Sequence, residues 1–418
     1  MNYIDIFAGA GGLSEGFTKQ GFEAVAHIEM NSDAVKTLQT RACYYYLKEQ
    51  NNLTPYYEYE KGHISREELY ALVPQSLIDS VLCETISEKS IKGIFVKVDN
   101  LLQANSAWNN EVDLVIGGPP CQAYSLVGRA IKSAKDRLIN ETEIKADPRN
   151  FLYKLYCRFL KKYKPKMFVF ENVPGLLTAE NGKYFRNMKA YLKRVGYVIE
   201  WREINANIFG VLQNRKRIII IGWRKGTNHH YPDFRPIQHN YLVNDILRDL
   251  PIIQAGGKNN RYRRIQPSQY LTDFEIRNNE DVLTWHIARS HIDRDKEIYR
   301  RVILAWNNGH QRLSYPNLPD ELRTHKNISS FIDRFKIVEG DTAACHTMMA
   351  HISKDGHYFI HPDILQARSI TVREAARIQS FPDNYYFEGS RTAAFTQIGN
   401  AVPPLLSEAI ARELLLQL

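Results

Sequence analysis

The stretch DIFAGAGGLSEGF, residues 5–17, decides the fold class of this chain. A short apolar run is followed by Gly9, Gly11 and Gly12, and then by a helix-forming segment that Ser14 can cap. Glycines at the end of a strand let a ligand approach the backbone closely. The order of strand, glycine-rich turn and helix is typical of the first unit of an α/β domain.

Seven β-rich runs alternate with helical segments over the first half of the chain. Several runs are continuously apolar, as buried strands of a covered sheet are, and helices are expected near 150–162 and 184–195. The pattern predicts a doubly wound, Rossmann-like α/β fold with ligands at the carboxyl ends of the strands. The expected strands are residues 3–7, 24–29, 93–99, 113–116, 167–171, 198–205 and 217–223.

The alternation of strands and helices stops after residue 223. At 418 residues the chain is long enough for two domains. Residues 224–367 are loop-rich, with basic and aromatic clusters, and helical patterning returns in residues 368–418. We expect a first domain at 1–223, a smaller irregular domain at 224–367, and completion of the first domain by 368–418.

The composition is that of an ordinary globular protein, with 44% hydrophobic and 24% charged residues. The longest aliphatic run, 218–221, is far short of a membrane span, and no secretory signal is visible, so a cytoplasmic protein is expected. Five scattered cysteines without a CxxC pair argue against a disulfide framework and a zinc site. A net charge of +9 mildly favours a polyanionic partner.

Two acidic residues indicate what the first domain binds. After Gly9, the dinucleotide fingerprint requires a glycine where this chain has Ser14, which disfavours a pyrophosphate. Glu29 ends the second expected strand, 20 residues after Gly9, where such folds use an acid to bind ribose hydroxyls. Asp99 ends the third expected strand and is a candidate acceptor for an adenine amino group. These features favour an adenosine-bearing cofactor without a pyrophosphate; turn-forming glycines and solvated acids are the alternative.

Chemically active side chains follow three further expected strands. In VIGGPPCQAYS, residues 115–125, two prolines stiffen the exit from a strand and present Cys121. Glu171 follows the buried run MFVF, and Arg215 and Arg217 lead into IIII. A thiol, a carboxylate and guanidinium groups at one edge can attack, protonate and neutralise developing charge. A buried cysteine, a capping glutamate and a solvated basic turn would explain each singly, but their joint placement favours a catalytic site.

The motifs together resemble those of the DNA (cytosine-5) methyltransferases. DIFAGAGGLSEGF, GGPPCQAYS, ENV, QNRKR, TVREAARIQSFPD and QIGNAVPP occur here in that family's order. The resemblance covers about residues 1–30, 93–223 and 368–418. It implies an S-adenosylmethionine-dependent methyltransferase fold, with 224–367 as a target-recognition domain, in a bacterial restriction–modification setting. The cofactor contacts that it implies are Phe7, Gly9, Gly11, Gly12, Leu13, Glu29, Met30, Asp99, Pro119, Leu152, Asn400 and Ala401.

The resemblance also implies a mechanism, and no metal is expected in it because the sequence offers no spaced metal ligands. The Cys121 thiolate adds to C6 of cytosine, and Glu171 binds N3 and the 4-amino group and favours protonation at N3. Arg215, and secondarily Arg217, stabilises the adduct and lowers the pKa of the thiol. After methyl transfer to C5, loss of the C5 proton and elimination free the enzyme. The C6 face is stacked in duplex DNA, so the target cytosine must be flipped out.

Contacts to DNA are expected from two segments. The polar stretch 123–150 is interpreted as a mobile loop that closes over the flipped base, with a solvated connector as the alternative. Basic residues of the recognition domain would contact phosphates or bases. The candidate DNA contacts are Ser125, Arg129, Arg261, Arg263 and Arg264.

A helical insert at about 40–92 departs from the family pattern, and its role is open between DNA contact, a partner surface and packing. A monomer that acts on double-stranded DNA is expected; the recognition sequence and any defence-system partner are not predicted. A tRNA cytosine-5 methyltransferase would lack so large a recognition segment and would carry a Cys-Phe-Thr signature, absent here. A catalytically silent DNA-binding regulator would not need the thiol, and Ser14 disfavours a nicotinamide oxidoreductase.

Overall fold

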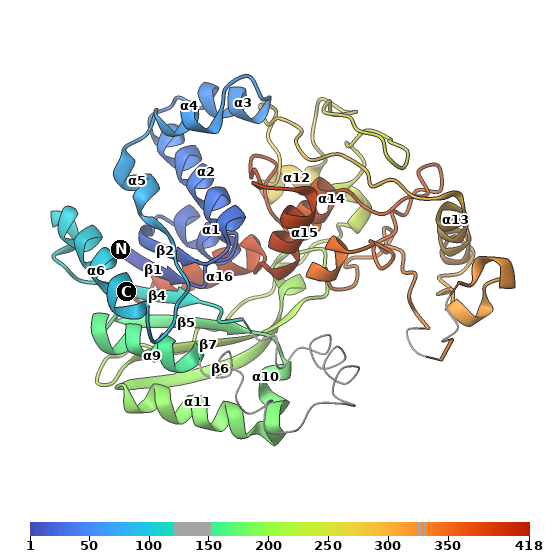
Figure 1. The fold of residues 1–418 in the computed structure, drawn as a ribbon. Coiled ribbons are helices and arrows are strands. Elements are labelled where there is room, and N and C mark those ends of the chain that lie inside the picture. The colour runs from blue at the N-terminus through green and yellow to red at the C-terminus, as the bar shows by residue number, and fades with distance from the viewer. Residues whose placement is uncertain (121–151, 325–327, 330–331) are drawn as a thin grey trace.

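The computed structural model describes residues 1–120, 152–324, 328–329 and 332–418. Its centre is a seven-stranded sheet with the strand order β3-β2-β1-β4-β5-β7-β6 (Figure 1). The strands from β3 to β5 are all parallel, while β7 runs antiparallel to both of its neighbours. The strands are β1 (Asn2–Ile6), β2 (Glu23–Glu29), β3 (Val81–Cys83), β4 (Leu114–Gly117), β5 (Met167–Asn172), β6 (Tyr197–Asn205) and β7 (Lys216–Arg224).

Six of the seven expected strands are confirmed, each to within one residue at either end. Every residue of β1 and β4 is buried, as in strands covered on both faces, whereas most of the edge strand β6 is exposed. The carboxyl ends of the parallel strands meet at one edge of the sheet, and the amino end of β7 lies at the same edge because β7 is reversed.

The strand expected at 93–99 is wrong, because these residues belong to the helix α6. Their β-branched composition suggested a strand, but the buried side chains of the segment recur every three or four positions, which is helical spacing. These side chains are Ile91, Ile94, Val98 and Leu102. The third strand is the short β3, which lies within the stretch that was expected to be the insert.

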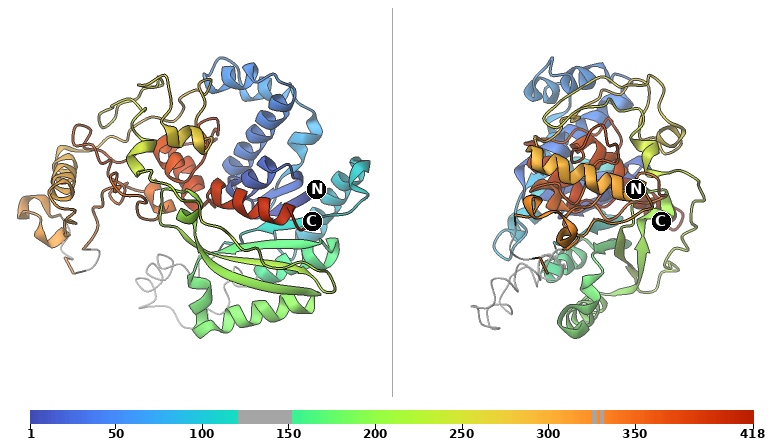
Figure 2. Two further views of the ribbon diagram at one scale, coloured as in Figure 1. Left: turned by 180° about the vertical axis from the view of Figure 1, so that it is seen from behind. Right: turned by 90° about the vertical axis from the view of Figure 1, so that its right-hand side faces the viewer.

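Helices cover both faces of the sheet, which confirms the doubly wound α/β fold (Figures 1 and 2). Side chains of α6, α9 and α11 share one hydrophobic core with the sheet, and α1 and α16 share another with its opposite face. The helices are α1 (Gly12–Lys19), α2 (Ser32–Glu49), α3 (Thr54–Glu60), α4 (Arg66–Tyr70), α5 (Gln75–Asp79), α6 (Ile91–Ala104), α9 (Leu152–Tyr163), α10 (Gly175–Thr178), α11 (Lys183–Arg194), α12 (Gln269–Asp273), α13 (Asp293–Asn307), α14 (Val372–Ile378), α15 (Arg391–Asn400) and α16 (Pro404–Leu415).

The insert is helical, and it packs on the carboxyl-terminal part of the chain. The Tyr56 hydroxyl, on α3, donates to the Asn384 carbonyl at 2.8 Å, and the Tyr59 hydroxyl donates to Glu388 at 2.5 Å. On α2, the buried Arg41 pairs with Glu15 at 2.9 Å and also donates to the Asn384 carbonyl at 3.0 Å. These contacts give the insert a packing role, since they fix the loop before α15 against α1 and α2.

Residues 224–367 contribute no strand to the sheet in the part of the chain that is described, and they divide between two cores. One core joins α12 and residues 243–250 to α14 and α15, so this part of the segment is packed together with the returning chain. The other is built by α13 with Tyr315, Leu318, Leu322, Phe335, Ile337 and Ile360, at the end of the molecule far from the sheet (Figures 1 and 2).

A buried ionic bridge joins the irregular segment to the returning chain. The guanidinium of Arg377, on α14, is held by Asp249 at 2.5 Å and by Asp383 at 2.5 and 2.9 Å, and all three side chains are at most 1% exposed. Burial alone would lower the pKa of Arg377, but the two aspartates outweigh this effect and raise it well above its usual value.

We expect Arg377→Ala to lower the free energy of unfolding by about 3–5 kcal/mol, because it breaks a buried ionic network and leaves Asp249 with Arg277 alone and Asp383 with Arg373 alone. Chemical denaturation measures this change. Arg301→Ala is the matched control: Arg301 pairs with Glu297 at 2.8 Å but is 44% exposed, so the loss should stay within about 0.5 kcal/mol. Equal effects of the two substitutions would contradict the bridge as a buried interaction.

Close backbone packing also joins α1 to the carboxyl-terminal segment. A Cβ on Gly12 would lie 2.2 Å from the Val402 carbonyl oxygen, whereas a Cβ on Gly93, in α6, would meet nothing within 4 Å. We therefore expect Gly12→Ala to destabilise the fold by more than about 1 kcal/mol, while Gly93→Ala stabilises it by about 0.4–1 kcal/mol through the unfolded state. Thermal unfolding of the two variants tests the contrast, which fails if they shift Tm in the same direction.

Candidate active site at the carboxyl edge of the sheet

At the carboxyl end of β5, the carboxyl group of Glu171 lies beside the guanidinium of Arg217. Glu171 is paired in the sheet with Ile219 of β7, so that Arg217 lies next to the end of β5. The Nε of Arg217 donates to Glu171 Oε1 at 2.7 Å, and both side chains are largely buried. The antiparallel β7 is what brings residues 171 and 217 together, since its amino end reaches the edge where β5 ends.

Burial and the neighbouring arginines act in opposite directions on the pKa of Glu171. Burial raises the pKa of the Glu171 carboxyl, and the charges of Arg217 and, to a smaller extent, Arg215 oppose that rise. Burial likewise lowers the pKa of Arg217, while Glu171 opposes that shift. A carboxyl group that can hold a proton above the usual range, beside a fixed cation, suits a general acid.

Arg215 is buried and does not contact Glu171 directly. Its Nη2 donates to the carbonyls of Gly399 and Ala401, each at 2.9 Å, and its Nη1 donates to the Met348 carbonyl. Its Nε has no partner among the described residues. Arg217 therefore pairs with the carboxylate, while Arg215 binds the returning chain; the expected action of both arginines on the adduct stays a prediction.

The same acid lies against the turn that follows β4. A Cβ on Gly118 would lie 2.6 Å from Glu171 Oε2, so a side chain there would displace the carboxylate. The Asn172 amide donates to the Pro119 carbonyl at 3.1 Å. Glu171 and Asn172 thus fix the turn that leads into residue 121. Cys121 itself, with Ser125 and Arg129, lies outside the described residues.

The glycine-rich turn after β1 divides into an open part and a packed part. Gly9 has a φ of +57°, and a Cβ there would meet no atom within 4 Å, so its backbone faces open space. Gly11 has a φ of +80°, and its Cβ would lie 2.8 Å from the Tyr385 hydroxyl. Gly12 and Leu13 pack on the carboxyl-terminal helix and its core. A side chain would find free space only at Gly9 of these three glycines, while packing excludes one at Gly11 and Gly12; the cofactor contacts expected of all three stay a prediction.

The residues that end β1 and β2 lie beside this open turn. Phe7 is half-buried, with a φ of +60°. Glu29 accepts from the Gly9 amide at 2.8 Å and from the Asn31 amide at 2.8 Å. Met30, the next residue, is 65% exposed, which is unusual for a large apolar side chain.

Asp99 does not lie at this edge, which corrects its expected position. It is a residue of α6, where it pairs with Lys162 at 2.8 Å and accepts from the Tyr163 hydroxyl at 3.2 Å. The place after the third strand belongs to Glu84, whose amide donates to the Glu29 carbonyl at 2.9 Å. The signal for Glu84 was the three-residue apolar run VLC before an acid, which is short enough to be overlooked.

The carboxyl-terminal contribution to the edge comes from the segment QIGNAVPP. Asn400 ends α15 and is exposed, while Ala401 is buried and its carbonyl accepts from Arg215. Ala401 also lies against Gly12, 3.0 Å from the position of its Cβ. Leu152 begins α9, is half-buried and packs on the core below the sheet. The chain around Gly12 therefore lies next to Ala401, as expected. Leu152 lies instead at the start of helix α9.

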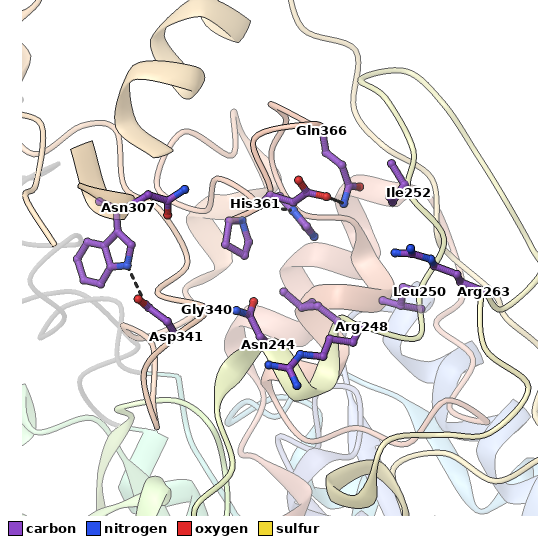
Figure 3. A pocket seen from close by; sticks show the side chains of 14 residues that line it. Asn244, Arg248, Leu250, Ile252, Arg263, Asn307, Gly340, Asp341, His361 and Gln366 are labelled. Atoms are coloured by element: carbon purple, nitrogen blue, oxygen red, sulfur yellow. Dashed lines mark hydrogen bonds between the residues drawn. The ribbon is translucent and has the colours of Figure 1, made fainter. Parts of the chain in front are cut away.

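The basic loop of the irregular segment is separate from this edge. Arg261, Arg263 and Arg264 are exposed, and the Arg264 carbonyl accepts from Arg277 at 3.1 Å. Arg263 also lines a cavity of about 270 Å³ with Arg248 and His361 (Figure 3). The residues that line this cavity all lie between 244 and 366, so it shares none with the cluster around Glu171.

Two absences concern the described residues. None of their helices is both long and apolar enough to cross a membrane. In the same part of the chain, no three histidine, cysteine, aspartate or glutamate side chains are grouped as metal ligands would be.

Known proteins resemble this chain over nearly its whole length. A family model for C-5 cytosine-specific DNA methylase matches residues 1–61 and 60–416. Type II methyltransferase M.Bpa9945I of Bacillus paralicheniformis is 43% identical over 447 residues, which cover 99% of this chain and 98% of that protein. Type II methyltransferase M1.HphI of Haemophilus parahaemolyticus is 30% identical, with coverage of 99% and 87%.

Solved structures share the fold. A DNA modification methyltransferase encoded within an E. coli prophage superimposes with a TM-score of 0.63 at 22% identity, covering 100% of this chain and 99% of that one. The Entamoeba histolytica methyltransferase EhMeth gives 0.52 at 15% identity, with coverage of 99% and 97%. The fold, the acid and arginine at its carboxyl edge, and the match of family and relatives over the whole chain identify it as a C-5 cytosine-specific DNA methylase, a DNA (cytosine-5) methyltransferase.

Proposed function

We propose that Cys121, Glu171 and Arg217 together activate a cytosine that has been flipped out of duplex DNA, for methylation at C5. The observation that carries this proposal is the buried pair of Glu171 and Arg217, 2.7 Å apart, against the turn that leads into Cys121. An acid with a raised pKa beside a fixed cation can protonate a ring nitrogen and stabilise the charge that develops.

Each residue type answers a need of the reaction. C5 of cytosine is a weak nucleophile, so the Cys121 thiolate adds to C6, which pushes electron density toward C5. Glu171 donates its proton to N3 as the adduct forms, and its carboxylate accepts from the 4-amino group. After methylation, the C5 proton leaves as a base removes it, the C6–S bond breaks, and N3 returns its proton to Glu171.

The two arginines take different roles in this proposal. Arg217 contacts Glu171 and is the group that stabilises charge on the base and on the carboxylate. Arg215 is a positioning residue, because its guanidinium binds the carbonyls of Gly399 and Ala401, on either side of Asn400. Arg215 would therefore act on the cofactor side through the backbone that carries Asn400.

The residues at the β1 and β2 ends fit S-adenosylmethionine. Gly9 opens onto free space, the Glu29 carboxylate can accept from ribose hydroxyls, and the exposed Met30 offers an apolar surface to adenine. Glu84 takes the place proposed for Asp99 as the acid after the third strand. When bound, S-adenosylmethionine supplies an electrophilic methyl group on its sulfonium.

The segment 224–367 would select the DNA sequence, and the enzyme would act within a restriction–modification system. The relatives named above are type II methyltransferases, which supports that setting. The segment leaves the catalytic sheet after β7 and returns at α14, so its sequence can vary while the edge around Glu171 is kept.

Plasmid DNA that carries 5-fluorocytosine throughout should trap the enzyme when S-adenosylmethionine is present. The fluorine cannot leave as a proton does, so elimination stalls after methylation and a complex stable to denaturant remains. Cys121→Ser should form no such complex, because a hydroxyl is a far poorer nucleophile at neutral pH. Denaturing electrophoresis followed by peptide mapping identifies the crosslinked residue.

The control is Cys157→Ser, since Cys157 is buried in α9, and burial raises the pKa of its thiol to about 12. This variant should trap DNA as the unmodified enzyme does. A crosslink mapped to Cys43, Cys83, Cys157 or Cys345, or normal trapping by Cys121→Ser, would overturn the proposed role of Cys121.

The pH dependence tests the pair of Glu171 and Arg217. A proton donor must be protonated in the free enzyme, so the single-turnover rate should fall as pH rises through the pKa of Glu171. Arg217 opposes the rise of that pKa, so Arg217→Gln should raise it further and move the alkaline limb to higher pH, with a maximal rate lower by on the order of 10².

Arg215→Gln is the matched variant, because Arg215 has the smaller influence on Glu171. Its alkaline limb should move less than that of Arg217→Gln. If the alkaline limb of the pH–rate profile is unchanged in Arg217→Gln, or moves to lower pH, the proposal is wrong that Glu171 acts as an acid whose pKa Arg217 lowers.

A further inference from the structure

One segment of the chain is strongly basic. Residues 152–194 contain eleven lysines and arginines but only two acidic residues, Glu171 and Glu180. Residues 206–268 form a second basic stretch, with eleven lysines and arginines and three acidic residues. In the first segment the basic residues lie on α9, α11 and their connections.

Helix α11 presents this charge on one solvent-facing stripe. It carries five basic residues and no acidic one, and four of the five are exposed. No carboxylate of the described residues forms an ion pair with any of them. The exposed four, here called the α11 stripe, are Lys183, Arg186, Lys193 and Arg194.

A comparison with α13 shows that such a stripe is not the general rule in this protein. On α13, Lys296 pairs with Asp293 at 2.6 Å, and Arg300 and Arg301 pair with Glu297 at 3.8 and 2.8 Å. The acids of α13 neutralise its basic residues locally, as is usual for a solvated helix face. The α11 stripe has no such acids, so its charge is left for a partner.

Aromatic rings support the basic side chains of α11. Lys189 lies 4.8 Å from the centre of the Phe185 ring, and Arg194 lies 5.8 Å from that of Tyr191. Trp201, on the edge strand β6, packs edge-on against Phe185 and is 38% exposed. The apolar rings hold the cationic groups near the surface without neutralising them.

We propose that the α11 stripe is a second, sequence-independent contact surface for duplex DNA, outside the active site. It spans 12 residues, or about 16 Å along the helix, a length over which one DNA strand presents about four or five phosphates. Helix α11 lies at the outside of the molecule, below β6, with α10 near one of its ends (Figure 1). It would hold DNA that flanks or precedes the target, without reading bases.

This inference rests on duplex DNA being the substrate, and salt-dependent binding tests it. The variant Lys183→Gln, Arg186→Gln, Lys193→Gln, Arg194→Gln should bind a random-sequence 40-base-pair duplex at least about tenfold more weakly at 0.1 M salt. The slope of log affinity against log salt should fall by about 3 to 4, because each lost phosphate contact removes about 0.9. Fluorescence anisotropy measures both quantities.

Two control proteins keep the test sharp. Lys48→Gln, Lys89→Gln, Lys92→Gln, Lys225→Gln removes four exposed lysines elsewhere and should leave the slope nearly unchanged. The charge-preserving variant Lys183→Arg, Arg186→Lys, Lys193→Arg, Arg194→Lys should bind as the unmodified protein does. Equal losses in the stripe variant and the lysine control, or no loss in either, would overturn the proposal.

Two further measurements are needed. One distinguishes DNA from a membrane as the partner, and the other distinguishes failure of this inference from failure of the proposed function. If the stripe variant loses binding to phosphatidylserine vesicles but not to DNA, the surface serves a membrane and the proposal is wrong. Transfer of labelled methyl groups to genomic DNA by the unmodified protein tests the methyltransferase function on its own. If the unmodified protein methylates DNA but the stripe variant keeps its salt slope, only the proposed role of the α11 stripe is overturned. If the unmodified protein does not methylate DNA, the proposed function is overturned.

Discussion

The buried guanidinium of Arg215 connects distant parts of the chain at the edge of the sheet. It precedes β7, whose Arg217 pairs with Glu171, and it donates to the carbonyls of Met348, Gly399 and Ala401. Charged groups this deep are retained only where hydrogen bonds replace the water they lose. The residues that Arg215 joins are up to 186 positions apart in sequence, so this one side chain couples the acid-bearing edge to the segment around Asn400.

At the edge of the sheet, Glu171 and Arg217 have few charged partners among the described residues. Glu171 has a raised pKa because it is buried, and Arg217 offsets only part of this effect. A more complete set of charge partners would hold the carboxyl ionised and useless as a proton donor. By contrast, Asp383 lies between Arg377 and Arg373, and its pKa is lowered in spite of burial. The first arrangement suits proton transfer, and the second suits a structural joint.

The insert and the irregular segment pack on the catalytic domain. They stabilise the edge of the sheet without adding side chains to the cluster around Glu171. Helix α3 fixes the loop at residues 384–388, and Arg377 fixes residues 246–249 to α14. The residues around both joints belong to a hydrophobic core other than the one that α9 and α11 share with the sheet. Neither joint involves the α11 stripe, and no carboxylate of the described residues pairs with it, which suits a long anionic partner.

The sequence by itself determined the sheet, the order of its strands in the chain, and the residue types at their carboxyl ends, because buried parallel strands are continuous apolar runs and catalytic side chains follow them directly. It misplaced the third strand, since the β-branched residues of 93–99 satisfy helical spacing equally well and β3 has only three residues. Tertiary structure alone decided that Arg217, rather than Arg215, pairs with Glu171, that Gly11 and Gly12 serve packing while Gly9 stays open, and that Asp99 pairs with Lys162. These outcomes depend on the reversed strand β7 and on the return of residues 399–402 against α1, contacts between distant segments that no local pattern encodes.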